Sequence, residues 1–306
     1  MVSTTLYTDP GCPWAYSEIP ALRVLQWRYG DQLDWRLVMI GLTESAAQYE
    51  DRGYTPLRGA VGRLRFRRYG MPFTPAPKSR ISATARACRA VVAARLSAPG
   101  TEWRVLRAIQ LANFTTPLLL DEDPELLDLL RAVPGVDAEE IIGSLDSPEV
   151  TEAYERDKAE TRSAAGSAAE LQGKAANTDG VVRFTAASVV FELNGRRLVA
   201  GGFQPIEAYD VLIANLDPSL ARTPPPEEPL PLLERFPEGL TTQEVAALLR
   251  QGNEPPDRRA AEAALLTLED NGQAIVISAG DSAIWAPSSS RELIAPGHRP
   301  VAVETG

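Results

Sequence analysis

The sequence predicts an α/β protein with a largely helical middle segment and a small α+β unit near the end of the chain. Three observations lead to this fold class. Residues 3–9, 12–30 and 34–42 have the patterns of a strand, a helix and a second strand, which together make a βαβ unit. Residues 79–176 show helical periodicity. The chain then returns to strand-like runs before a helix at 206–216.

The first strand ends in a sharp turn that places a thiol at the start of the first helix. An Asp-Pro-Gly turn precedes Cys12, and a Pro-Trp pair follows it. A helix start offers unpaired backbone N–H groups and about half a positive charge, both of which stabilise a thiolate. Cys12 is therefore predicted to be a nucleophile with a pKa below that of a free thiol. The alternative is a small buried hydrophobic residue.

The first helix is predicted from an apolar stripe of near-helical spacing. The stripe consists of Ile19, Leu22, Leu25 and Trp27. Gly30 is a natural end for this helix. The strand at 34–42 lacks strict alternation, which is typical of a buried strand, and the crossover between the two strands should be right-handed.

Residues 43–80 are predicted to be irregular. Within them, residues 63–75 form a basic cluster interleaved with aromatic residues. Arginine suits the recognition of carboxylates, so this cluster could hold an anionic substrate or the carboxylates of a low-molecular-weight thiol. The alternative is a solvated helix face followed by a proline-rich loop.

Helical patterns fill the middle segment from 79 to 176. Cys88 lies within the first apolar stripe and is predicted to be a core residue. Ser147 followed by Pro148 is a helix start signal. The later helical segments are expected at 103–114, 124–130, 138–144 and 148–171.

Two strand-like runs, 181–192 and 197–200, flank an Asn194-Gly pair. An Asn-Gly pair between two such runs is a strong hairpin signal. The helix at 206–216 follows the hairpin.

The strand, Asp-Pro-x-Cys-Pro-Trp-x-Tyr motif and helix resemble the DsbA-like thioredoxin-fold family. The resemblance is to the branch that includes FrnE-like oxidoreductases and, more distantly, 2-hydroxychromene-2-carboxylate isomerases and kappa-class glutathione transferases. It covers about residues 3–218. It implies a thioredoxin fold with an inserted α-helical domain that lids the active site.

The chain departs from the family pattern at two positions. Redox members carry Cys-Pro-Trp-Cys, and Ala15 replaces the second cysteine here. Because that second thiol frees the first from a mixed disulfide, any redox cycle would need an external thiol. Family members also place a cis-proline just before the hairpin strand, where Ala187 stands here. A cis peptide before alanine costs about 2.5–4 kcal/mol, so we expect this bond to be trans.

The resemblance also implies which residues form the site. Cys12 would be the catalytic nucleophile. The residues that would bind the substrate or a thiol are Pro13, Trp14, Ala15, Ala187 and Ser188.

A proline-rich stretch and a compact unit follow the region of resemblance. Residues 219–239 are predicted to be a stiff extended linker. Thr241 and Glu244 have capping-box spacing at the start of a helix. Two helices and a β-hairpin then resemble a winged-helix arrangement shortened by at least one helix. The expected domains are a thioredoxin-like domain (1–78 and 177–218), an inserted helical domain (79–176), the linker (219–239), a winged-helix-like domain (240–290) and a tail (291–306).

Composition limits the partners and cofactors. The chain has 306 residues, a net charge of −10, two cysteines and one histidine, His298. The net charge repels nucleic acid and anionic membranes, and acidic residues offset the arginines of the helix at 257–271. A metal site of His and Cys is not expected, nor is a tightly bound cofactor. A low-molecular-weight thiol is the expected co-substrate, and a homodimer is an open alternative.

The start of the chain shows no secretory signal, and no apolar stretch is long enough to cross a membrane. Two cysteines without a disulfide framework favour a reducing compartment. We therefore expect a cytoplasmic protein.

Three functions remain open. The first is a monothiol thiol-disulfide oxidoreductase, in which Cys12 attacks and an external low-molecular-weight thiol resolves the product. The second is a catalytically lapsed binding or regulatory protein that works through the winged-helix-like unit. The third is a thiol-cofactor-dependent isomerase or transferase, in which Cys12 would take the place of a serine that holds the bound thiol.

Overall fold

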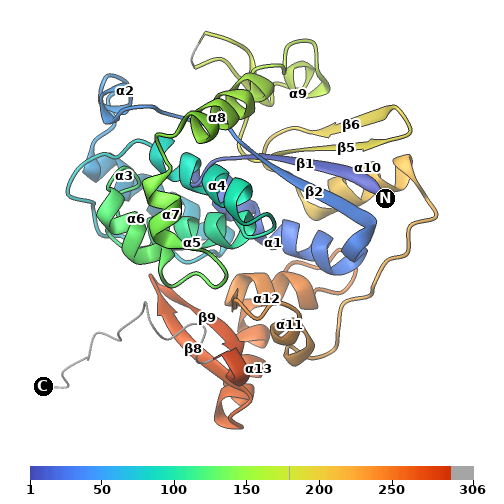
Figure 1. Cartoon of the computed structure of the whole chain (residues 1–306). Helices are drawn as coiled ribbons and strands as arrows, with labels where there is room; N and C mark the ends of the chain where they lie inside the picture. The colour runs from blue at the N-terminus through green and yellow to red at the C-terminus, as the bar shows by residue number, and fades with distance from the viewer. Residues whose placement is uncertain (179, 291–306) are drawn as a thin grey trace, which may run out of the picture.

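The computed structural model describes residues 1–178 and 180–290, and its central element within them is a four-stranded mixed sheet (Figure 1). The strand order is β2-β1-β5-β6. β1 and β2 are parallel, whereas β5 runs antiparallel to both β1 and β6. The strands are β1 (Val2–Thr8), β2 (Leu33–Met39), β5 (Ser188–Leu193) and β6 (Arg196–Ala200).

Helices cover both faces of this sheet. α1 (Pro13–Tyr29) connects β1 to β2 and packs beside α10 (Ile206–Leu216), which lies against β5 and β6. On the other face, α8 (Pro148–Thr161) lies against β2 (Figure 1). A short 3-10 helix, η1 (Gly30–Gln32), follows α1. The predicted thioredoxin-like α/β fold is therefore confirmed.

A helical region is inserted between β2 and β5, as predicted. Within it, α4 packs against α5, α7 and α8. Its elements are α2 (Ala46–Glu50), α3 (Pro56–Phe66), η2 (Arg67–Tyr69), α4 (Ala85–Ser97), α5 (Glu102–Thr115), α6 (Asp123–Leu130), α7 (Ala138–Gly143), α8 and α9 (Ala168–Leu171), followed by the short strands β3 (Ala175–Ala176) and β4 (Arg183–Phe184).

The prediction that residues 43–80 are irregular is wrong, because α2 and α3 lie within them. The N-terminus of α3 is capped, because the Thr55 hydroxyl accepts a hydrogen bond from the Arg58 N–H at 3.2 Å. Pro56 occupies the first helical position, where proline is favoured. Gly59 and Gly62 lie inside this helix and weaken its signal in the sequence.

Two predicted elements are broken in the structure. The helix expected at 148–171 stops at Thr161 and resumes as α9. The strand expected at 181–192 is divided into β4 and β5. The Ala186–Ala187 peptide bond between them is cis, so the expectation of a trans bond is wrong. The Ser188 hydroxyl holds the backbone around this bond, since it donates to the Thr185 carbonyl at 2.7 Å and accepts from the Gly202 N–H at 3.0 Å.

The last part of the described chain forms a second, smaller sheet with three helices. Its strand order is β7-β9-β8. The elements are α11 (Leu230–Arg235), β7 (Leu240–Thr241), α12 (Thr242–Leu249), α13 (Arg258–Asp270), β8 (Ala274–Ala279), β9 (Ser282–Pro287) and the 3-10 helix η3 (Ser288–Ser290).

The predicted extended linker, 219–239, contains α11 and is therefore not extended throughout. Leu232 and Leu233 are fully buried, and their burial stabilises a helix whose prolines lie in its first turn. The predicted tail at 291–306, which includes His298, lies outside the described residues.

The C-terminal unit packs on α1, as α12 lies directly against that helix (Figure 1). One continuous hydrophobic cluster includes Leu25 of α1 and Leu248 of α12. The tip of the β8–β9 hairpin reaches further, because the Asp281 carboxylate accepts from the Phe73 N–H at 2.8 Å and pairs with Arg67. In the part of the chain that the structure describes, no helix combines the length and apolar character of a membrane span.

Candidate active site

Cys12 lies at the junction of β1 and α1. Its N–H donates to the Asp9 carbonyl at 3.2 Å, which closes the turn after β1, and its own carbonyl accepts from the Tyr16 N–H at 3.0 Å. Cys12 is thus the N-cap residue of α1 and is only 8% exposed. Its Sγ donates to the Ala186 carbonyl at 3.5 Å, which joins the thiol to the loop before β5.

The surroundings of Cys12 oppose ionisation. Burial raises the pKa of Cys12 to about 11, and the nearby Asp9 carboxylate adds to this rise. Hydrogen bonds from the Ala15 and Trp14 N–H groups, together with the charge of Arg183, lower the pKa by less. The prediction of a lowered pKa is therefore wrong for this structure, because the loss of water around the sulfur outweighs the N–H groups of the helix start.

The thiolate fraction of Cys12 is therefore expected to reach one half near pH 11. Because alkylating reagents react with the thiolate, modification by iodoacetamide should accelerate about tenfold per pH unit between about pH 7 and about pH 10. Mass spectrometry of tryptic peptides measures this rate, and the fully buried Cys88 is the internal control for intact folding. A rate that levels off below about pH 8.5 would contradict the raised pKa.

Asp9 is one of the residues of the site for which the sequence predicted no role. Its fully buried carboxylate accepts hydrogen bonds from the Gly11 N–H at 2.9 Å, the Thr84 hydroxyl at 3.1 Å and the Cys88 thiol at 3.4 Å. Burial raises its pKa, and these hydrogen bonds partly oppose the rise. A Cβ at Gly11 would lie 2.5 Å from Thr84 Cγ2, so the turn needs glycine. An acidic residue at the end of a buried strand was the available signal.

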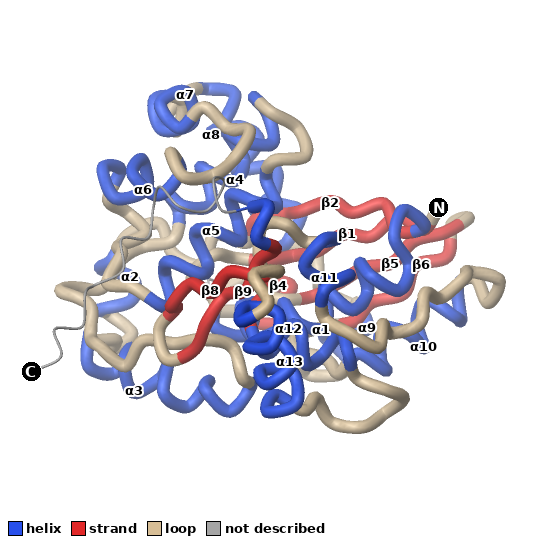
Figure 2. The backbone as a smooth tube through the Cα atoms, turned by 90° about the horizontal axis from the view of Figure 1, so that it is seen from below, coloured by secondary structure: helices blue, strands red, loops and turns tan. Residues whose placement is uncertain are grey.

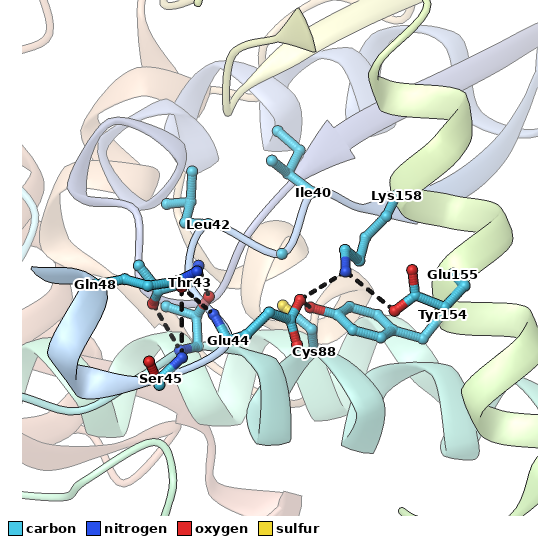
Figure 3. Close-up of polar contacts among 12 residues, drawn as sticks. Ile40, Leu42, Thr43, Glu44, Ser45, Gln48, Cys88, Tyr154, Glu155 and Lys158 are labelled. Atoms are coloured by element: carbon cyan, nitrogen blue, oxygen red, sulfur yellow. Dashed lines mark hydrogen bonds and ion pairs between the residues drawn. The ribbon is translucent and has the colours of Figure 1, made fainter. Parts of the chain in front are cut away.

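The loop after β2 completes the surroundings of Asp9 and is itself attached to α8 (Figure 3). Leu42 N–H donates to the Asp9 carboxylate at 2.9 Å. Two residues later, Glu44 accepts from the Tyr154 hydroxyl at 2.9 Å and pairs with Lys158 Nζ at 2.8 Å. The helical insert therefore holds the loop that contacts the buried carboxylate.

The predicted core role of Cys88 agrees with its complete burial. Figure 3 shows it on the helix next to Tyr154 and Glu44. Its thiol also donates to the buried Asp9 carboxylate, and this hydrogen bond connects Cys88 to the turn that carries Cys12. Burial raises the pKa of Cys88 well above its usual value.

The structure brings together some of the predicted binding residues. Pro13 and Trp14 lie at the surface beside Cys12, and Trp14 is 38% exposed. Ala15 and Ala187 are buried, and the backbone contact to Cys12 comes from Ala186. The Ser188 hydroxyl forms its hydrogen bonds within the protein, to the Thr185 carbonyl and from the Gly202 N–H.

Four aromatic side chains from three segments gather at the surface beside Cys12. Trp14 lies with its ring centroid 4.8 Å from Phe66 and 5.5 Å from both Tyr69 and Phe203. Tyr69 and Phe203 are 4.9 Å apart. Phe66 and Tyr69 belong to the basic and aromatic cluster seen in the sequence, whereas Phe203 was missed because it lies far along the chain.

The arginines of that cluster are largely occupied within the protein. Arg63 Nε donates to the Thr74 carbonyl at 3.2 Å, and Arg67 pairs with Asp281. Arg68 lies over the Tyr69 ring, 4.9 Å from its centroid. These contacts limit the predicted role of the cluster in holding an anionic substrate.

A groove of about 1010 Å³ lies elsewhere, between α5, α6 and residues 234–238, and Cys12 does not line it. Across residues 1–178 and 180–290, no group of three or more His, Cys, Asp or Glu side chains could hold a metal ion.

Comparison with known proteins gives a family and several similar structures. A family model described as a DSBA-like thioredoxin domain matches residues 5–166. No curated protein matches the chain. Among solved structures, a putative protein disulfide isomerase from Nitrosomonas europaea is 20% identical, with a TM-score of 0.54, and the match covers 70% of this chain and 96% of that one.

Two further structures are similar. A probable DsbA oxidoreductase from Streptomyces coelicolor is 18% identical, with a TM-score of 0.54, and the match covers 73% of this chain and 92% of that one. The cytosolic disulfide reductase DsbM from Pseudomonas aeruginosa is 19% identical, with a TM-score of 0.49 and coverage of 71% and 100%. At these identities the likeness concerns the fold.

Proposed function

The chain belongs to the family of DSBA-like thioredoxin domains, and on this basis we propose that it is a thiol-disulfide oxidoreductase that works through Cys12 alone. One observation carries the proposal. Cys12 lies at the N-cap position of α1, where the N–H groups of Trp14 and Ala15 lower its pKa, and its Sγ donates to the Ala186 carbonyl at 3.5 Å. These N–H groups would stabilise the thiolate once the proton has left.

The reaction at Cys12 consists of two exchanges. The Cys12 thiolate attacks one sulfur of a substrate disulfide, a new S–S bond forms to that sulfur, and the other sulfur leaves as a thiolate. An external thiolate then attacks the mixed disulfide, and Cys12 leaves as the thiolate. One S–S bond breaks and one forms in each step, so after both steps one substrate sulfur is a thiolate and the other is in a disulfide with the external thiol. A second external thiolate then displaces that sulfur, so that in total two external thiols are oxidised to their disulfide and the substrate disulfide is reduced to two thiols.

An external thiol is needed because the chain offers no second thiol at the site. Ala15 stands where a resolving cysteine would act, and it is 2% exposed. Cys88 is fully buried and donates to Asp9. A low-molecular-weight thiol is the proposed co-substrate, and such thiols are abundant in the reducing cytoplasm, which we propose as the compartment.

The test is formation of a mixed disulfide at Cys12. The protein is incubated with oxidised glutathione at about pH 8, and peptide mass spectrometry locates any glutathionyl group. We expect one group on Cys12, none on Cys88, and removal by added reduced glutathione. Cys12→Ser is the matched control and should remain unmodified. An unmodified Cys12 in the folded wild-type protein would contradict the proposal.

A second candidate is a binding protein that has lost the chemistry. It is favoured by the 8% exposure of Cys12 and by the rise of its pKa to about 11. Its working surface would be the winged-helix-like unit, 240–290. The glutathione experiment separates the two candidates, because a lapsed protein would leave Cys12 unmodified while its fold stayed intact.

A further inference from the structure

A polar cavity of about 60 Å³ lies between β1, α1 and α5, and Cys12 does not line it. Thr8 of β1 and Gln110 of α5 line this cavity and are only 2% and 3% exposed. Within the described residues, neither the Thr8 hydroxyl nor the Gln110 amide has a hydrogen-bond partner. Buried polar groups are normally hydrogen-bonded, and a cavity of this size has room for a small polar group. Two unpaired side chains at one cavity therefore indicate a polar ligand.

The polar end of the cavity is electrically balanced. Arg107 Nε is buried without a hydrogen-bond partner, whereas the other two nitrogens of this guanidinium lie 2.7 and 3.0 Å from the Glu244 carboxylate. Arg23 also lines the cavity, and it pairs with Glu238 at 2.7 Å and with Glu244 at 3.3 Å. Two arginines thus face two carboxylates. Because burial of an unpaired charge is costly, this end of the cavity favours an uncharged polar group over an ion.

The cavity adjoins the groove of about 1010 Å³, since Arg23, Trp103 and Arg107 line both. Helix α5, which carries Trp103 and Arg107, lies between α6 and the strands β8 and β9 (Figures 1 and 2). In the groove, Trp35 and Trp103 meet edge to face, with their ring centroids 5.6 Å apart. A volume of this size with aromatic walls is typical of sites for small organic molecules. The groove can therefore hold a ring whose polar substituent enters the cavity.

We propose that the cavity and the groove together bind an uncharged aromatic molecule that carries a primary amide. An amide presents a donor and an acceptor side by side, and the Gln110 amide offers the complementary pair. The Thr8 hydroxyl and Arg107 Nε supply further donors to the carbonyl of the ligand. A carboxylate lacks the donor that Gln110 Oε1 needs, and both arginines already pair with glutamates. The ring of the ligand packs against Trp103.

The test measures binding of two probes by isothermal titration calorimetry. The first probe is 2-naphthamide, and the second is 2-naphthoate, which has the same rings but carries a charge and no N–H donor. The two variants are Gln110→Leu and Thr8→Val, because each removes the polar atoms of one side chain and nearly keeps its size. The matched control is Gln172→Leu, at an exposed position that lines neither the cavity nor the groove.

We expect saturable binding of one 2-naphthamide per chain and binding of 2-naphthoate that is at least about tenfold weaker. Gln110→Leu should weaken binding of 2-naphthamide at least about tenfold, Thr8→Val should weaken it in the same direction, and the control should bind like the wild type. If 2-naphthamide does not bind, if both variants keep the affinity of the wild type, or if the two probes bind equally well, the proposal is wrong.

Urea unfolding without ligand gives an independent readout. Because leucine leaves no unpaired polar group in the cavity, Gln110→Leu should raise the urea midpoint of the unliganded protein while it weakens binding. A midpoint below that of the wild type would mean that the Gln110 amide already has a partner, which would overturn the proposal.

Cys12→Ser separates this site from the thiol. Cys12 lines neither the cavity nor the groove, so this variant should bind 2-naphthamide with the affinity of the wild type, whatever the glutathione experiment shows. Loss of binding in Cys12→Ser would place the probe at the thiol and contradict the assignment to the cavity.

Discussion

Replacing Glu244 with alanine is expected to cost about 3–5 kcal/mol of stability, because it leaves two arginines without their buried partner. Its fully buried carboxylate lies 2.7 and 3.0 Å from two nitrogens of Arg107 and 3.3 Å from Arg23 Nε. It also completes a capping box, since the Thr241 N–H donates to it at 2.7 Å. One carboxylate therefore joins α12 to both α1 and α5.

Urea unfolding of the wild type and of Glu244→Ala measures this loss, with Glu262→Ala as the matched control from the exposed face of α13. The control should change stability by less than about 0.5 kcal/mol. If Glu244→Ala lowers the free energy of unfolding no more than the control does, the ion pairs of Glu244 do not stabilise the packing of the C-terminal unit on α1 and α5.

The pH dependence gives a second measure of the same attachment. Burial alone would raise the pKa of Glu244, but Arg107, Arg23 and hydrogen bonds hold it below the usual value of 4.5. The stabilisation is thus present above pH 4.5 and lost as pH falls through the folded-state pKa. The difference between wild type and Glu244→Ala should shrink in that acidic range.

Replacing Glu18 with glutamine is expected to remove a loss of stability that occurs as pH rises from about 4.5 to about 8. Glu18 lies on α1 and is 1% exposed. Burial raises its pKa from 4.5 to about 8, although hydrogen bonds from the Tyr209 hydroxyl at 2.8 Å and the Gln204 N–H at 3.3 Å oppose the rise. Between these pH values the folded protein keeps the proton that the unfolded chain has released, so stability falls.

Each pKa unit corresponds to about 1.4 kcal/mol, so this one group accounts for a few kcal/mol between pH 5 and 8. Stability of the wild type and of Glu18→Gln is measured by urea unfolding across this range. The advantage of the variant should grow by that amount towards pH 8. Glu152→Gln, at an exposed position of α8, is the control and should show no such trend. Parallel profiles for wild type and Glu18→Gln would contradict the raised pKa.

The C-terminal unit also contacts the loop that contributes aromatic residues to the candidate site. Asp281 holds the Phe73 N–H and pairs with Arg67, on either side of Tyr69. Tyr69 in turn packs on Trp14 beside Cys12. The unit therefore braces the loop that carries part of the aromatic surface, even though it lies more than two hundred residues from Cys12 in the chain.

Much of the fold could be predicted from local signals. The strand, helix and strand patterns of residues 3–42 predicted the βαβ unit, the Asn194-Gly pair predicted the β5–β6 hairpin, and Thr241 with Glu244 predicted the start of α12. Each signal acts between residues only a few positions apart, so the sequence displays it directly. A helix in the region of α3 was given only as an alternative, a solvated helix face, because two glycines and an exposed apolar face obscure its pattern.

By itself, the sequence determined that a single thiol begins the first helix of a thioredoxin-like domain and that no second cysteine stands beside it. Only the tertiary structure decided the state of that thiol. The loop at Ala186 and the helical insert come from distant parts of the chain, and together with Asp9 they exclude water from Cys12. Desolvation depends on everything packed around a group, and for this reason the helix start alone could not predict the pKa.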